Sequence, residues 1–349
     1  MQDNGGSMVK HAYIVGAGFS RPLGGPLFTD LLTMEYWKVH SDMEISDDIR
    51  QCLVLLHRAE GRPIDEILGL TERLNAEEVI ALLEWCSRNP ATKRASLVCD
   101  AFPVIPAKLK YKTNEEFLTV LNTQLKRLIA CQCNSFTQLL EADSDTTAPY
   151  KSWLQGLTSD DTIITFNYDT AIETLAFTCG IEFPRAPTEY KSNQPRIIHV
   201  HGCVDWIKSG NKLLYEHQGY LRDNDLCIGL PGLEKAKITE IAEMKSLWMS
   251  MRHAINEAEV VSIVGYSMPA TDNMARQAIL ASLKHGQRVN FVLGGDSFTS
   301  GRMQSLIQPI VGTDSFGLSR AVDLKMYAQD YLPNIRHYQQ FGYSVKTSR

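Results

Sequence analysis

Short apolar segments recur along the chain, and each is followed by glycine or small polar residues. The segments have the length and composition of buried strands, and they cover 11–15, 162–166, 196–200, 260–264 and 289–293. Helices are expected after two of them, at 169–177 and 271–283. Buried strands that alternate with helices are typical of a parallel sheet covered on both faces. We therefore expect an α/β fold built on a Rossmann-like parallel sheet.

The stretch between the first two strands has a different pattern. Apolar residues recur there at helical spacing, which predicts a large helical insertion or subdomain. We expect a loose tail at 1–8, a Rossmann-like core formed by 9–25 and 158–300, the helical insertion at 26–157, and a C-terminal segment at 301–349. The C-terminal segment carries no motif, and we expect it to contact an oligomer partner or another protein.

The composition excludes several classes of protein. The 349 residues carry a net charge of −5, so a broad basic surface for nucleic acid is not expected. No apolar run is long enough for a membrane span, and the first residues lack the apolar core of a secretion signal. The eight cysteines form no C-x-x-C pair, so we expect free thiols in a reducing cytoplasm and no zinc site.

The residues that follow the strands indicate a binding site. In open parallel sheets, ligands bind beyond the carboxyl ends of the strands. Five such ends carry small or polar residues here: Gly16-Ala17-Gly18, Asn167-Tyr168-Asp169, His201-Gly202, Gly265-Tyr266-Ser267 and Gly294-Gly295-Asp296. We expect these residues to gather at one edge of the sheet.

The first turn, 16–20, favours a phosphate ligand. Glycine lets a ligand approach the backbone closely, and the N-terminus of a following helix attracts negative charge. A tight turn without a ligand is the alternative. The third glycine of the pattern G-x-G-x-x-G is replaced by Arg21, and no acidic residue follows a second strand at the expected distance. The sequence therefore disfavours a hydride-transferring dehydrogenase.

Polar residues after the next two strands are candidates for catalysis. Asn167 carries an amide, which orients a hydroxyl or a water molecule without titrating. Asp169 binds a ligand, caps the following helix, or does both. His201 is a candidate for proton transfer, because the ordinary pKa of histidine lies near neutrality. His199 is interpreted as structural, since a metal pair with His201 lacks a third ligand nearby.

The turn at 265–267 is a second candidate for binding a phosphate or a ribose, through Gly265 and Ser267. Thr271 or Asp272 is expected to cap the helix that follows. Cys203 has no base or acidic partner in the surrounding sequence, so we interpret it as structural.

Taken in order, these residues resemble the sirtuin superfamily, in particular the bacterial sirtuin-like branch of anti-phage defence NAD hydrolases. Gly16-Ala17-Gly18-Phe19-Ser20 resembles the opening Gly-Ala-Gly-x-Ser loop, and Phe166-Asn167-Tyr168-Asp169 resembles the Gln-Asn-x-Asp motif with Phe in place of Gln. Val200-His201-Gly202 resembles the His-Gly motif, and Gly265-Tyr266-Ser267 the Gly-Thr-Ser loop. The two cysteine pairs of the sirtuin zinc module are missing, which argues against protein deacetylation.

The resemblance implies that the substrate is NAD⁺ and that the bond between nicotinamide and ribose is hydrolysed. Asn167 would position the ribose or the attacking water, Asp169 would support the ribose, and His201 would act as the base. The resemblance implies nucleotide contacts from the strand ends, at Gly16, Ala17, Gly18, Phe19, Ser20, Arg21, Gly265, Ser267 and Asp296. Ser20 and Ser267 would hold the pyrophosphate, and Asp296 the adenosine ribose. Arg21 would either neutralise a phosphate or lie in solvent.

The resemblance also implies a biological setting. Members of this branch deplete NAD⁺ when triggered, and they act as homo-oligomers, some with a DNA-translocating ATPase or an Argonaute protein. Two other functions are compatible with the same residues. One is an NAD-dependent protein deacylase or ADP-ribosyltransferase, and the other is a non-catalytic module that senses NAD⁺ or ADP-ribose.

Overall fold

The structure is a computed structural model of the chain, and it describes residues 9–28, 30–31, 76–100, 113–140, 144–184, 187, 193–210, 212–217, 226–229 and 240–335. The chain divides into two compact units. The sheet unit consists of Met1–Gly25, Thr137–Val200 and Lys245–Arg349, and the second unit consists of Pro26–Phe136 and His201–Met244.

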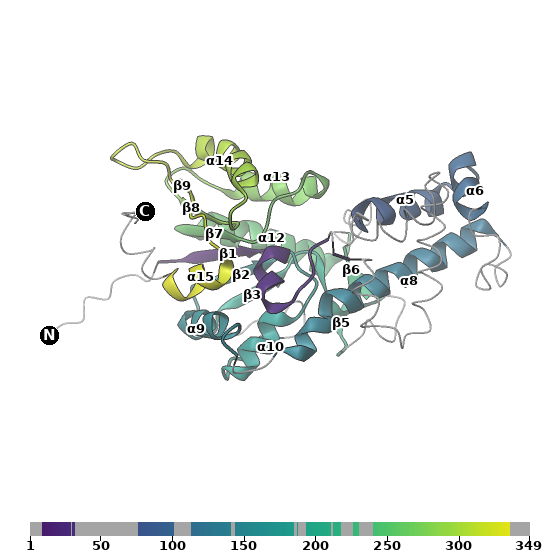
Figure 1. The fold of residues 1–349 in the computed structure, drawn as a ribbon, viewed down its shortest axis with the longest axis horizontal. Helices are drawn as coiled ribbons and strands as arrows, with labels where there is room; N and C mark the ends of the chain where they lie inside the picture. Colours follow the sequence, from purple (N-terminus) through teal and green to yellow (C-terminus); the bar gives the residue numbers. More distant parts are fainter. Residues whose placement is uncertain are drawn as a thin grey trace. The chain divides into compact units, whose positions relative to one another are not determined.

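The sheet unit is built on six parallel strands (Figure 1). They are β1 (His11–Val15), β2 (Thr162–Thr165), β3 (Arg196–His199), β7 (Val260–Val264), β8 (Arg288–Val292) and β9 (Ala321–Asp323). Their order across the sheet is β3-β2-β1-β7-β8-β9, so the chain moves outward in opposite directions from β1 and β7. This arrangement confirms the expected α/β fold with a Rossmann-like parallel sheet.

Burial explains why these segments form strands. Every residue of β1 and of β7 is buried, as expected of central strands that are covered on both faces. Helices supply that cover: α1 (Ala17–Ser20), α9 (Ala148–Gly156), α10 (Ala171–Thr178), α12 (Ala242–Glu257), α13 (Asn273–Ser282), α14 (Ser297–Val311) and α15 (Ala328–Tyr331). Within the sheet unit, α9 packs against α10 and α15, while α14 packs against α13, β8 and β9.

The helices after β2 and β7 begin later than the sequence suggested. We expected helices at 169–177 and 271–283, whereas α10 begins at Ala171 and α13 at Asn273. Residues 169–170 lie in the loop after β2, and residues 271–272 lie in a 3-10 helix, Ala270–Asp272. After β2 and β7, the carboxyl edge of the sheet is therefore not formed by the starts of α-helices.

The second unit contains α5 (Ala76–Arg88), α6 (Lys93–Asp100) and α8 (Asn114–Asn134). It also contains an antiparallel sheet of β4 (Gly202–Ser209), β5 (Lys212–Tyr215) and β6 (Leu226–Ile228), in the order β5-β4-β6. The sequence reasoning did not anticipate this small sheet. In the helical part, α8 packs against α5 and α6.

The two units differ from the expected domains in several places. Thr137–Val200 belongs to the sheet unit, so α9 packs there although it lies in the stretch expected to be a helical insertion. His201–Met244 belongs with the helices of the second unit. The expected C-terminal segment supplies most of α14 and the edge strand β9 to the sheet unit. The expected tail at 1–8 lies outside the described residues.

No helix in the part of the chain that the structure describes is both long enough and apolar enough to cross a membrane. Within the same residues, no three His, Cys, Asp or Glu side chains come together as metal ligands. Cys203 is buried in β4. That placement supports the structural interpretation of this residue.

Candidate functional site

The ends of five parallel strands lie in one row. The last residues of these strands are paired in register across the sheet: Val15, Thr165, His199, Val264 and Val292. The direction of the chain changes between β1 and β7, which makes this pair the topological switch point of the sheet. In doubly wound folds the ligand binds beside that point. The row defines the carboxyl edge at which a site is expected.

Three glycines hold the loops after β1 and β7 in direct contact. A Cβ on Gly16 would lie 2.8 Å from the carbonyl oxygen of Gly265, and one on Gly18 would lie 2.8 Å from the Cα of Gly265. Gly265 itself has a φ of +63°, and its Cβ would lie 2.1 Å from the backbone nitrogen of Phe19. The two loops interlock in a way that only glycine allows.

The backbone of the first loop is largely occupied by its own hydrogen bonds. The N–H of Gly16 donates to Val264 at 3.1 Å, that of Gly18 to Gly265 at 2.9 Å, and that of Phe19 back to Gly16 at 2.8 Å. The helix that follows, α1, is a single turn, and a 3-10 helix at Arg21–Leu23 continues it. Phosphate binding by this backbone therefore stays a prediction that the loop's own bonds make less favourable.

A tyrosine from α9 forms a hydrogen bond to the same loop and packs against it. The Tyr150 hydroxyl donates to the carbonyl oxygen of Phe19 at 2.8 Å, and both side chains are buried. The Phe19 ring meets the rings of Tyr150 and Trp153 edge to face, at centroid distances of 5.1 and 5.5 Å. The loop is thus fixed by the β7 loop on one side and by α9 on the other.

A directed chain of hydrogen bonds joins the loop to the end of β2. The Asn167 amide donates from Nδ2 to Gly16 O at 3.2 Å and to Ser20 Oγ at 2.9 Å. The Ser20 hydroxyl donates in turn to Asp169 Oδ2 at 3.3 Å. Asp169 Oδ1 accepts from the N–H of Ala171 at 3.1 Å. The expected residues of the first two strand ends therefore form one connected cluster.

The chain fixes the orientation of the Asn167 amide. A backbone carbonyl only accepts hydrogen bonds, so the atom facing Gly16 O must be the nitrogen. Both amide hydrogens are then used, by Gly16 and Ser20. The amide oxygen, Asn167 Oδ1, accepts no hydrogen bond from the described residues. Asn167 thus presents an oriented acceptor at the carboxyl edge.

The sequence left ligand binding and capping of the following helix open for Asp169, and the structure shows a contact to the start of that helix. Its Oδ1 holds the first turn of α10, while its Oδ2 accepts from Ser20. Burial raises the pKa of Asp169 to about 6; the Ala171 hydrogen bond opposes that shift, and the Glu173 carboxylate adds to it. The carboxyl group of Asp169 therefore changes its protonation state close to neutral pH. Ligand binding by Asp169 stays a prediction.

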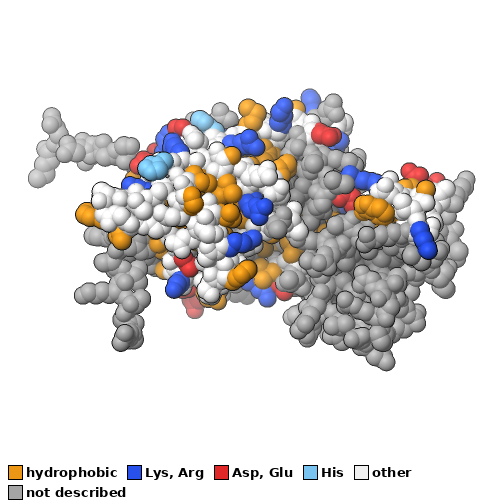
Figure 2. Space-filling view, turned by 90° about the horizontal axis from the view of Figure 1, so that it is seen from above, with side chains coloured by type: hydrophobic (Ala, Val, Ile, Leu, Met, Phe, Trp, Pro, Cys, Tyr) orange, Lys and Arg blue, Asp and Glu red, His pale blue; other side chains and the backbone are white. Residues whose placement is uncertain are grey.

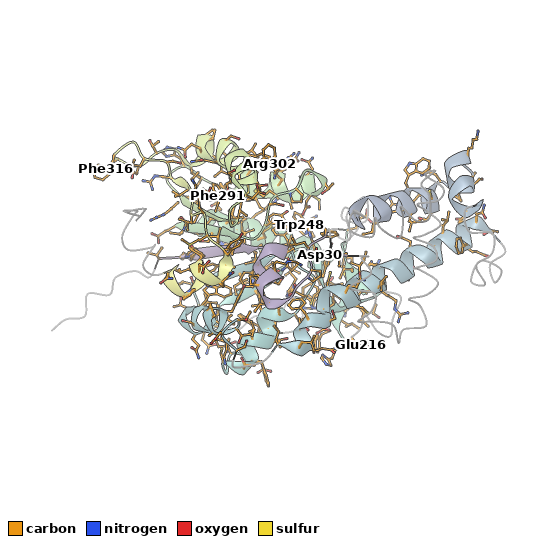
Figure 3. The ribbon with its side chains drawn as sticks, in the orientation of Figure 1. Asp30, Glu216, Trp248, Phe291, Arg302 and Phe316 are labelled. Carbon is orange, nitrogen blue, oxygen red and sulfur yellow. The ribbon has the colours of Figure 1, made fainter. Side chains whose placement is uncertain are left out.

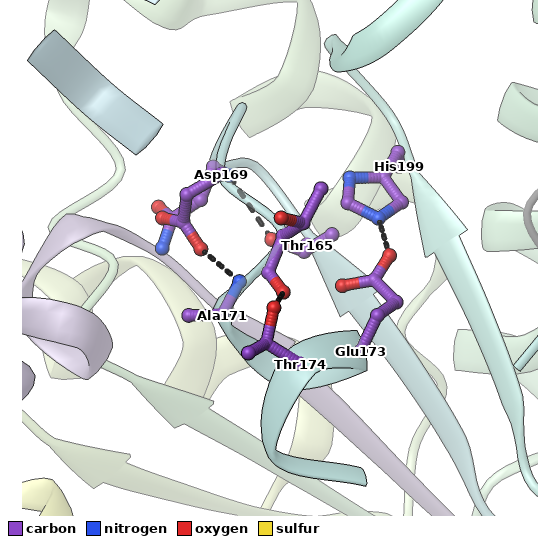
Figure 4. Close-up of polar contacts among 8 residues, drawn as sticks. Thr165, Asp169, Ala171, Glu173, Thr174 and His199 are labelled. Atoms are coloured by element: carbon purple, nitrogen blue, oxygen red, sulfur yellow. Dashed lines mark hydrogen bonds and ion pairs between the residues drawn. The ribbon is translucent and has the colours of Figure 1, made fainter. Parts of the chain in front are cut away.

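A buried acid–base pair lies beside Asp169. His199 Nε2 and Glu173 Oε1 are 2.6 Å apart, and both side chains are buried (Figure 4). Burial by itself would lower the pKa of His199, but the charge and hydrogen bond of Glu173 outweigh it and raise this pKa. His199 is therefore a hydrogen-bonding partner of Glu173 in α10, which extends the structural interpretation made from the sequence. Glu173, in the first turn of α10, was not anticipated.

The loop after β7 is ordered by aromatic packing. Tyr266 stacks on Phe166 with ring centroids 4.2 Å apart, and its hydroxyl donates to Asp272 Oδ2 at 2.8 Å. Asp272 occupies the N-cap position of α13, but its side chain makes no capping bond to the helix. Met268 is buried with a φ of +48°, a strained conformation for a residue with a side chain. Ser267 is exposed at this strained turn.

The outer candidates have local roles as well. Asp296 is the N-cap of α14, and its Oδ1 accepts from the N–H of Thr299 at 3.0 Å. Hydrogen bonds from Thr299 are the main reason that the pKa of Asp296 is lowered, and the Arg302 charge contributes. Asp296 and Arg21 are both exposed. Ribose binding by Asp296 and phosphate binding by Arg21 stay predictions.

His201 belongs to the second unit, two residues beyond the end of β3. Its side chain is buried, and its carbonyl oxygen accepts from Gly229 at 2.7 Å. The next residue, Gly202, has a φ of +81°, and a Cβ there would lie 2.0 Å from the carbonyl oxygen of Cys227. The glycine of the His-Gly pair is thus required by the turn into β4. The placement of His201 relative to Asn167 stays a prediction.

The sheet unit therefore brings together Gly16, Ser20, Asn167, Asp169 and Gly265, which the sequence placed on separate strand ends. A scan against protein-family models and a search of curated proteins found no match to this chain.

Proposed function

We propose that this chain binds NAD⁺ at the carboxyl edge of its sheet and hydrolyses the bond between nicotinamide and ribose. The products would be nicotinamide and ADP-ribose. The observation that carries the proposal is the Asn167 amide, whose oxygen is left as an oriented acceptor beside the switch point. The resemblance of the strand-end residues to sirtuin-like NAD hydrolases supplies the identity of the substrate.

Asn167 would act by orientation. Nicotinamide leaves as a neutral molecule from a cationic pyridinium, so the leaving group needs no acid. The ribose carbon that it leaves behind is electron-poor and reacts with a water molecule held nearby. An acceptor at Oδ1 would hold that water, or a ribose hydroxyl, through its O–H. Positioning of this kind contributes several kcal/mol to rate enhancement in general.

Ser20 and Asp169 would act through Asn167. The serine hydroxyl has one hydrogen, with Asp169 Oδ2 at 3.3 Å and the Ala17 carbonyl oxygen at 3.5 Å as its acceptors, while the serine oxygen accepts from the amide. Ser20 is 2% exposed, which suits a link between two side chains better than a contact with a phosphate. We assign Asp169 the same positioning role, in place of direct support of the ribose.

His201 would supply the base that removes a proton from the attacking water or from a ribose hydroxyl. What supports this role is the resemblance of Val200-His201-Gly202 to the family's His-Gly motif, together with the strand-end position of His201. The biological setting is part of the same proposal: a cytoplasmic, oligomeric effector of anti-phage defence that depletes NAD⁺ when a partner triggers it.

The test is a measurement of nicotinamide and ADP-ribose released from NAD⁺ by the full chain. Wild type is compared with Asn167→Ala and His201→Ala, with and without an acylated peptide. Product release that both variants lose would support the proposal, and full activity in both would contradict it. Turnover that requires the peptide would identify a deacylase or transferase. Tight binding of NAD⁺ without any product would identify a sensing module.

A further inference from the structure

A single arginine from α14 reaches across to the loop after β7. Arg302 projects from the second turn of this helix (Figure 3), and its Nη2 donates to the carbonyl oxygen of Ser267 at 2.5 Å. The Arg302 charge also acts on Asp296, the N-cap of the same helix. Arg302 therefore joins two of the strand ends at which nucleotide contacts are expected, although no sequence motif singled it out.

The guanidinium of Arg302 has donors to spare. Arginine carries five N–H bonds in a planar fork that matches the geometry of phosphate. One of them is given to Ser267, and the Nε–H is buried without a hydrogen-bond partner among the described residues. A buried donor that is left unused costs free energy comparable to a lost hydrogen bond. The terminal N–H groups that Ser267 does not use lie at the exposed end of the side chain, where an anion can reach them.

The neighbouring groups leave this role to a side chain. In the first loop, the N–H groups of Gly16, Gly18 and Phe19 are already donated within the protein, and Ser20 is committed to Asp169. These groups are the usual means by which a glycine loop holds a phosphate. On the face that Figure 2 shows, Lys and Arg side chains lie among apolar ones.

We infer that Arg302 binds the phosphate groups of the ligand at the carboxyl edge, as the main cationic contact to a dinucleotide pyrophosphate. The inference rests on the proposed function for the identity of the ligand. Its own basis is the exposed end of the guanidinium, which the bond to Ser267 holds at the loop after β7 and which keeps further N–H groups to spare. Arg302 would hold the diphosphate beside the loop after β7, and its hydrogen bond to the Ser267 carbonyl would fix the conformation of that loop.

The experiment measures the affinity of three probes by titration calorimetry: ADP-ribose, inorganic pyrophosphate and adenosine. Arg302→Gln is compared with wild type, with Arg302→Lys, and with the control Arg276→Gln, which removes an arginine of α13 bonded only locally to Asn273. We expect Arg302→Gln to weaken ADP-ribose and pyrophosphate binding about 10- to 100-fold while adenosine binding is unchanged. Arg302→Lys should keep part of the affinity, and Arg276→Gln all of it.

The outcomes separate this inference from the proposed function. Equal binding of ADP-ribose by wild type and Arg302→Gln overturns the anion site, whatever the chain does to NAD⁺. Loss of pyrophosphate binding in Arg302→Gln supports the site even when wild type cleaves no NAD⁺. A loss that includes adenosine shows only that Arg302 shapes the loop, and it overturns the inference. The inference is also overturned if the wild-type chain binds neither ADP-ribose nor pyrophosphate.

Discussion

The sheet unit holds two buried polar clusters that use similar side chains in opposite ways. At the carboxyl edge, Asn167, Ser20 and Asp169 form an open chain that ends in an unused amide oxygen. In the interior, Ser262 of β7 lies between His11 Nε2 at 2.7 Å and the Tyr331 hydroxyl at 2.6 Å. Both clusters are buried and cross between strands distant in sequence.

Their ionisation differs. Burial raises the pKa of Asp169 to about 6, within reach of ordinary conditions. Burial, with a smaller contribution from the Arg288 charge, lowers the pKa of His11 to about 3, so this imidazole stays neutral. The neutral network around Ser262 holds strands together. In the open chain at the carboxyl edge, Asp169 titrates near neutral pH, so its protonation can respond to a ligand. Burial of polar residues does not distinguish the two; the unused acceptor does.

Paired alanine variants should separate the clusters most clearly. We expect Asn167→Ala to lower NAD⁺ cleavage about 100- to 1000-fold, because an oriented polar group is lost. Ser262→Ala should instead lower the free energy of unfolding by about 1–3 kcal/mol, since His11 and Tyr331 lose their common partner, with unchanged activity per folded molecule. Product assays and urea unfolding of both variants check this. The comparison fails if Ser262→Ala is the variant that loses activity.

Lowering the pH should reduce the free energy of unfolding, because of the depressed pKa of His11. An unfolded chain keeps the ordinary histidine pKa of 6.5, so below that pH the unfolded state takes up a proton that buried His11 refuses down to about pH 3. Relative to His11→Gln, wild type should lose roughly 3 kcal/mol of stability between about pH 7 and about pH 4. Urea unfolding across that range measures the slope. Parallel curves for the two proteins would show that His11 does not titrate in this way.

Asp169 should give a slope of the opposite sign. Its pKa is higher in the folded chain than the ordinary 3.8, so its contribution to stability is full below that pH and is lost as the pH rises through about 6. Relative to Asp169→Asn, wild type should lose roughly 2–3 kcal/mol between about pH 4 and about pH 7. Urea unfolding of both proteins across this pH range measures the difference. A difference between the two proteins that is independent of pH would contradict the raised pKa.

The mildest change is expected at the acid–base pair. Glu173→Gln removes the carboxylate that outweighs burial, so the pKa of His199 should fall. A pH titration of the His199 ring signals by NMR measures this directly. The matched variant Glu182→Gln removes an exposed carboxylate after α10 and should leave the titration unchanged. An unaltered His199 pKa in Glu173→Gln would mean that the pair does not set the charge of this histidine.

The sequence was sufficient for features that depend on neighbouring residues. A buried apolar run followed by glycine located β1 and β7, and with the parallel order of strands it brought Gly16 and Gly265 to one edge. It did not show β9, because Ala321–Asp323 is too short for any periodicity. Nor did it show Glu173, Tyr150 or Arg302 in their roles, since each depends on which distant side chain packs against it.

The interlocked glycine loops have a consequence for biosynthesis. Gly16 and Gly18 are translated near the beginning of the chain, whereas Gly265, against which they pack, is added much later. A nascent chain that does not yet include the loop after β7 lacks the residue against which Gly16 and Gly18 pack. The glycine loop can therefore take its final position only after the chain has been translated beyond Gly265.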